Sequence, residues 1–376
     1  MKYKILFIAL ILITSVFNSN RVISATESEI TKDTELIYKA RVQQAGESRR
    51  QNIPGTDTLH TYQNITFVVL NKDKAGQTVS IGNDYSMLSV GDVFFVKYLK
   101  TYEGEEVWTV SDPYRLPILL YSFLLFVFLV IILGGKQGIF SLLSLLGSFA
   151  GLFYILFPGI LAGYNPILLS GALAIAVLFL VMYVTHGFNR MTTSAFIGCV
   201  ITISITILLS YFVVIYAKLT GFTDEEAVYL NFNTRGSIDF QGLLLGAIII
   251  GVIGIIDDIA ITQASVVSEL RKLGNNLTNK DIFSRAMKIG KDHTGAVVNS
   301  LVLAYTGASL PLLLLIYTSD VPLLELLNSE VIATEIARTI IGSIGLVLAV
   351  PITTFFAVTL IKKGNNSPTH IHPHSH

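Results

Sequence analysis

Hydrophobic residues follow two different patterns along the chain, and the change comes near Pro117. Between about Thr34 and Tyr114, short runs of β-branched and aromatic residues are separated by Gly, Asn, Asp and Lys. This pattern predicts about five strands in a small barrel or sandwich. Because no cluster of His, Asp or Trp stands out, a folded cap is the simpler interpretation, and a ligand-binding module is the alternative.

After Pro117 the apolar runs become long enough to cross a bilayer, which takes about 20 helical residues. The length criterion predicts about seven spans, at residues 117–133, 138–157, 167–184, 194–217, 238–256, 294–317 and 337–360. The amino terminus has Lys2 and Lys4, a shorter apolar stretch, and then small residues near Ala25. This pattern is typical of a cleaved signal peptide, with a retained anchor helix as the alternative.

The amino-acid composition also indicates a membrane protein. Of the 376 residues, 52% are hydrophobic and 14% charged, which is too little polar surface for a water-soluble globule. We therefore expect an α-helical polytopic membrane protein with a small extracytoplasmic all-β domain. The expected domains are a signal peptide or anchor at 1–25, the β domain at 26–116, the transmembrane helices at 117–363 and a flexible cytoplasmic tail at 364–376.

Charged residues predict the orientation of these helices. If the β domain lies outside, the inward loops contain Lys136, Arg190, the basic group from Arg271 to Lys291, and Lys362 with Lys363. The outward loops contain the acidic residues near Asp224 and Asp320. Basic residues on the cytoplasmic side are the usual arrangement in membrane proteins.

Several function classes are disfavoured by the sequence. The formal net charge is zero without long charged runs, so no nucleic-acid partner is expected. The single cysteine, Cys199, excludes an intramolecular disulfide and a Cys-based zinc site. No catalytic triad, phosphate-binding glycine loop or metalloprotease helix is present, so we expect neither an enzyme nor a cofactor or metal. The alternating histidines from His370 to His376 are too short a tract to predict a metal site.

Two adjacent carboxylates, Asp257 and Asp258, end the apolar run of the fifth expected span. That run starts near Asp239, and about 27 Å of helix separates the two ends, close to the thickness of the hydrocarbon core. The pair is thus expected at the inner boundary of the membrane. In one interpretation, Asp258 is the N-cap of a following amphipathic surface helix.

In the other interpretation, Asp258 faces a polar crevice and takes up and releases a proton or cation. Asp257 would raise its proton affinity as a neighbouring carboxylate. Thr262 and Glu269 continue a polar stripe from Asp258, and Asn299 in the next span is a candidate companion. Adjacent helical residues point about 100° apart, so only one of the two aspartates is expected to face the site.

Small residues surround the pair. Gly242, Gly246 and Gly254 allow a neighbouring helix to approach closely, and Pro311 allows the sixth span to bend. These features suit a transport unit with broken helices, and they equally suit ordinary tight helix packing.

The segment IIDDIAITQASVVSEL, with the later run DIFSRAMKIGKDHTGAVVNSLVLAYTGASLPLLL, resembles the YibE/F family of polytopic bacterial membrane proteins. The resemblance extends over most of the chain after Pro117. It implies a multi-pass protein of the bacterial cell membrane, and it assigns no activity and no site residue.

A fainter resemblance connects the chain with the SecD and SecF export components and other RND transporters. Asp257 and Asp258 stand at their acidic positions, Glu269 and Arg271 in their amphipathic helix, and Asn299 in the following span. This chain departs from them by about two extra spans and a smaller outward domain.

These observations favour a permease or translocation component that uses an ion gradient to move an unknown solute. The alternative is a non-transporting envelope scaffold or sensor. The expected partner is the lipid bilayer, and association with a second copy or with other membrane proteins is left open.

Overall fold

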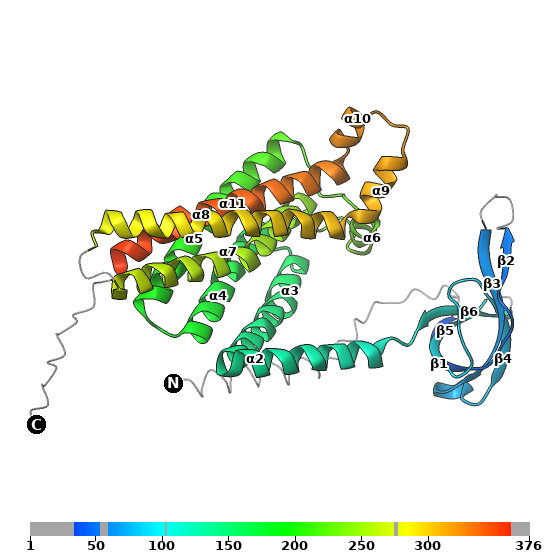
Figure 1. The fold of residues 1–376 in the computed structure, drawn as a ribbon. Helices are drawn as coiled ribbons and strands as arrows, with labels where there is room; N and C mark the ends of the chain where they lie inside the picture. The colour runs from blue at the N-terminus through cyan, green and yellow to red at the C-terminus, as the bar shows by residue number, and fades with distance from the viewer. Residues whose placement is uncertain (1–33, 53–58, 102–103, 274–276, 362–376) are drawn as a thin grey trace, which may run out of the picture. The chain divides into compact units, whose positions relative to one another are not determined.

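The computed structural model describes residues 34–52, 59–101, 104–273 and 277–361 (Figure 1). The expected signal peptide or anchor at 1–25 and the histidine-containing tail at 364–376 lie outside the described residues. The chain divides between Leu129 and Val130 into two compact units, one formed by the strands and the first part of the helix that follows them, and the other by the remaining helices.

The first unit contains one antiparallel sheet of six strands: β1 (Thr34–Ala45), β2 (Arg49–Asn52), β3 (Leu59–Val69), β4 (Thr78–Asn83), β5 (Val93–Lys100) and β6 (Glu106–Pro113). The strand order is β2-β3-β1-β5-β6, and β4 pairs with β3. The expectation of a small β domain is confirmed in outline. Strand β2 was not expected because its residues, RRQN, are polar and all exposed, so they show no hydrophobic alternation.

An aromatic cluster forms the core of this sheet. Tyr38, Phe67 and Phe94 are fully buried, and the ring centroids of Trp108 and Tyr98 are 4.7 Å apart. The short 3-10 helix η1 (Lys72–Lys74) lies at one end of the core, where the Nζ of its last residue is 4.0 Å from the Tyr98 ring centroid. Aromatic side chains each bury a large apolar area, and aliphatic residues such as Ile65 and Val96 complete the core.

The remaining elements are helices: α2 (Leu116–Gly151), the π-turn η2 (Leu152–Leu156), α3 (Phe157–Leu161), α4 (Pro166–His186), α5 (Arg190–Tyr216), α6 (Glu225–Asn233), α7 (Phe240–Leu273), α8 (Asn279–Ala308), α9 (Leu310–Thr318), α10 (Leu323–Asn328) and α11 (Glu330–Leu360). Side-chain capping hydrogen bonds stabilise the first turns of several helices. Asn189 accepts from the amide of Thr192 at α5, and Thr278 forms a capping box with Asp281 at α8.

Within the described residues, five helical segments are long and apolar enough to cross a membrane, or six if the bent pair α8 and α9 is one span. The first of them, Leu116–Leu161, contains a break at Gly135, where φ is 53° and ψ is −132°. This break falls in the gap between the first two expected spans. The bend of 68° between α8 and α9 has Pro311 in the first turn of α9. The apolar helical character is confirmed, whereas the expected number of about seven spans is not.

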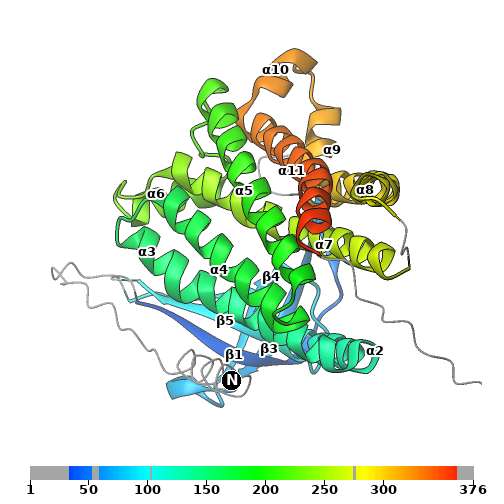
Figure 2. The ribbon, with the colours of Figure 1, turned by 90° about the vertical axis from the view of Figure 1, so that its left-hand side faces the viewer.

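Helices α5, α7 and α11 pack together, with α4 and α8 against them (Figure 2). Glycine allows α7 to approach α4: a Cβ atom at Gly242 would lie 3.2 Å from Pro166 Cδ, and one at Gly246 would lie 3.3 Å from Ser170 Cβ. A Cβ atom at Gly254 would meet no atom within 4 Å. Helix contact therefore requires the first two glycines and not the third.

The start of α11 is tied to the loop after α5. The Oε1 atom of Glu330 accepts hydrogen bonds from Thr220 N at 2.6 Å, Thr220 Oγ1 at 2.7 Å and Gly221 N at 2.8 Å. Gly221 has a φ of 88°, which other residues rarely adopt. One carboxylate oxygen thus joins segments about 110 residues apart in the sequence.

We expect Glu330→Ala to lower the free energy of unfolding by about 1 to 2 kcal/mol, because three charge-assisted hydrogen bonds are lost at a partly exposed position. Thermal unfolding of the purified protein measures the effect. Glu325→Ala, which removes an exposed carboxylate from α10, is the matched control and should leave the unfolding temperature unchanged. Equal unfolding temperatures for the two variants would contradict this prediction.

Candidate functional site

Helix α7 continues without interruption through the carboxylate pair, from Phe240 to Leu273. Asp258 is therefore not the N-cap of a new helix, and that interpretation is wrong. The Asp258 amide donates to the Asp257 Oδ1 atom at 2.8 Å. The helix continues because its next turns present a buried apolar face, formed by Ile259, Ala260, Ala264 and Val267.

A pocket of about 530 Å³ lies beside the pair, between α2, α4 and α7. Its polar lining consists of Gln137, Ser141, Thr185, His186, Asp257 and Asp258. Asp257 is half-buried and Asp258 is exposed. Both carboxylates line the pocket, although we expected only one to face a site, because a pocket this wide extends over more than one face of α7.

The pocket favours positive charge. Among its described lining residues the two aspartates are the only acidic side chains, and no Lys or Arg belongs to the lining. The lining also contains the neutral hydroxyl groups of Ser141 and Thr185. The Thr185 Oγ1 atom lies 3.5 Å from the Oγ atom of Ser144, which is next to the pocket in sequence on α2. Uncompensated carboxylates in a pocket raise the local concentration of protons and cations.

The other expected site residues are distributed differently. Thr262 is half-buried one turn after Asp258. Glu269 is paired with Lys272 at 2.7 Å and lies outside the pocket. Asn299 is exposed on α8 and does not line the pocket. The structure thus places the carboxylates beside residues of α2 and α4 rather than beside α8.

Sequence reasoning missed the partners of the pair on α2 and α4. One of them is His186 at the end of α4, whose imidazole lines the same pocket. Sequence reasoning also missed Gln263, which is 1% exposed and whose Oε1 atom accepts from Thr354 Oγ1 at 3.3 Å. An amide in an otherwise apolar helical stretch was the available signal for this link between α7 and α11.

Described residues contain no group of three His, Cys, Asp or Glu side chains placed to hold one metal ion, so His186 and the two aspartates do not form such a group. The pocket therefore offers separate carboxylates to a proton or a cation rather than a compact ligand set.

Comparison with known proteins gave one result. No curated protein and no solved structure matched the chain. A family model described as YibE/F-like protein matches residues 122–363, which include α4 to α11 and both aspartates. Since this match extends over more than half of the sequence, the chain belongs to the YibE/F family.

Proposed function

We propose that this protein is a multi-pass protein of the bacterial cell membrane that moves a solute or polymer by means of an ion gradient. In this proposal the β unit is outside and Asp258 is the coupling group, with Asp257 as its neighbour. The observation that carries the proposal is the pocket beside the pair, where α7 continues without interruption past the end of its apolar run.

The energetics of the pair support a working role. Carboxylates within membrane helices are rare, and such residues usually face a polar cavity and serve transport. Apolar packing surrounds the pair, with Ile256 and Ile259 both at most 1% exposed. A structural role alone does not account for two carboxylates at this point of α7.

Coupling requires the carboxylate to change its charge and its access to water. We propose that Asp258 is neutralised by a proton or binds a cation when the pocket opens to one side, and releases it to the other. The helix breaks at Gly135 and between α8 and α9 are the positions at which the bundle would bend. Broken helices near the binding site are common in secondary transporters.

The test uses a reporter that leaves both aspartates intact. Ser141→Cys in a Cys199→Ser background places one thiol in the pocket lining. We expect its labelling by membrane-impermeant reagents in vesicles to change when a proton gradient is imposed. Adding Asp258→Asn is expected to abolish that dependence, and Asp257→Asn to weaken it.

Glu269→Gln in the same background is the matched control. It removes a carboxylate from the same helix outside the pocket, so the gradient dependence should remain. Labelling of the Ser141→Cys thiol from one side only, unchanged by the gradient and by Asp258→Asn, would contradict the transport proposal. That result would favour the scaffold or sensor function instead.

A further inference from the structure

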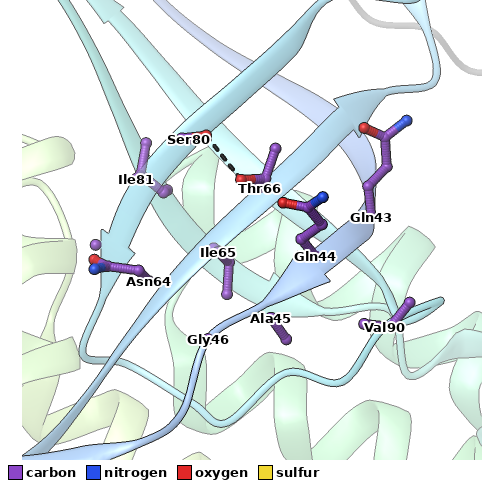
Figure 3. Close-up of a pocket in the computed structure, with 11 residues that line it drawn as sticks. Gln43, Gln44, Ala45, Gly46, Asn64, Ile65, Thr66, Ser80, Ile81 and Val90 are labelled. Atoms are coloured by element: carbon purple, nitrogen blue, oxygen red, sulfur yellow. Dashed lines mark hydrogen bonds between the residues drawn. The ribbon is translucent and has the colours of Figure 1, made fainter.

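The sheet of the first unit has a hollow of about 750 Å³ over β1, β3 and β4 (Figure 3). Figure 3 shows the Thr66 and Gln44 side chains on one side of the strands and those of Ile65 and Ala45 on the other. Residues from both sides of the strands belong to the lining, so the hollow is formed where β1, β3 and β4 lie next to one another.

Strand register places polar side chains in a row across this face. Gln44 of β1 is opposite Thr66 of β3, which is opposite Ser80 of β4. The hydroxyl groups of Thr66 and Ser80 are hydrogen-bonded at 2.8 Å. A register shift between Val42 and Gln44 marks a bulge that contains Gln43, which also lines the hollow. Bulges often reorient a side chain next to a binding site.

The neighbouring row has an amide between two glycines. Asn64 of β3 pairs with Gly82 of β4, and on its other side its carbonyl accepts from Gly46 N at 2.8 Å. The Gly46 flank of the exposed Asn64 amide has no side chain, whereas the Tyr62 ring occupies the flank at Gly82. A Cβ atom at Gly82 would collide with the Tyr62 ring, so this aromatic ring lies against the second row.

Chemically, the lining is uncharged and combines amide and hydroxyl groups with apolar side chains. The described residues around the hollow include no Lys, Arg, Asp, Glu or His. The amides of Gln43, Gln44 and Asn64 each offer two donors and an acceptor oxygen, and the two hydroxyl groups offer both functions. Such a set matches a ligand that presents neighbouring hydroxyl groups, each of which donates and accepts.

We infer that this hollow binds a neutral saccharide. Neutral lining disfavours a nucleic acid or another polyanion, which requires basic residues. An added peptide strand would pair with the backbone of a sheet edge such as β4 and would leave the amide side chains of the hollow unused. The apolar side chains of Ile81 and Val90 belong to the same lining as the amides, as the mixed polar and apolar faces of a sugar require.

The experiment titrates the full chain in lipid nanodiscs with maltotetraose, chitotetraose, a sulfated disaccharide and a neutral extended peptide, and measures binding by calorimetry. We expect one of the two neutral tetrasaccharides to bind. We expect the sulfated disaccharide not to bind. Asn64→Ala should weaken that binding by about three- to tenfold, as loss of one or two hydrogen bonds implies. Asn64→Trp, which fills the hollow, should abolish it.

Thr78→Ala is the matched control, because Thr78 is exposed on the same strand as Ser80 and lies outside the hollow. Its affinity should equal that of the unmodified protein. The inference is overturned if neither tetrasaccharide binds, if Asn64→Trp binds as well as the control, or if only the peptide binds. Since no residue of the carboxylate pocket takes part, the result is independent of the proposed transport.

Discussion

Replacing Gly198 by leucine is expected to lower the free energy of unfolding of the helical unit by about 3 kcal/mol or more, the upper range for overpacking. Gly198 lies on α5 where that helix contacts α11. A Cβ atom there would lie 2.9 Å from the Thr353 Cα atom, which belongs to the backbone and has no other rotamer to adopt. The two helices would have to separate.

Separation of α5 from α11 would affect more than one contact. Gly345 of α11 faces α5 in the same way, since a Cβ atom there would lie 2.9 Å from Thr206 Oγ1. Thr353 and Thr206 are almost completely buried. Because packed interiors tolerate little added volume, the strain extends along the whole contact between these helices.

Thermal unfolding in detergent measures this effect, with Gly254→Leu as the matched control. The control makes the same change in a helix where an added Cβ atom meets nothing within 4 Å. It should be neutral or slightly stabilising, since leucine favours helix over glycine. If Gly198→Leu unfolds at the same temperature as Gly254→Leu, α5 and α11 do not pack as described.

The elements of the fold could largely be predicted from the sequence, because run length and alternation of apolar residues determine them. The short strands before Pro117 and the long apolar helices after it both appear in the structure. Helix ends were less predictable. Hydropathy ends the fifth expected span near Ile256, but α7 continues to Leu273, since a helix does not stop where its composition turns amphipathic.

The candidate site could be predicted only in part. Asp257 and Asp258 stand out because carboxylates are rare in apolar runs. Their neighbours Ser141 and Thr185 come more than 70 residues earlier and are ordinary in membrane helices, so only the packing of α2 and α4 near α7 identifies them. The same holds for Gly198, whose need for close approach depends on a helix that follows much later in the chain.

Arg271 illustrates a further limit of the sequence. It was expected in an inward loop, yet it lies in the last turn of α7 and is 8% exposed. Its Nη2 atom donates to the Val358 carbonyl of α11 and to Asn279 Oδ1 at the start of α8, each at 2.7 Å. The last carbonyls of a helix lack partners within it, and a cation there is favourable.

We therefore expect Arg271→Ala to lower the free energy of unfolding by about 3 kcal/mol, because two charge-assisted hydrogen bonds are lost and a carbonyl near the end of α11 is left unpaired. Arg271→Lys should recover only part of the lost stability, since an ammonium group does not reproduce the planar guanidinium.

Lys272→Ala is the control. It removes the adjacent basic residue, an exposed side chain paired with Glu269, and should change stability by less than about 0.5 kcal/mol. Thermal unfolding measures both variants. A large loss of stability in Arg271→Ala alone would show that this side chain holds α7, α8 and α11 together. Equal small losses of stability in both variants would mean that Arg271 acts only as one of the surface charges that orient the protein.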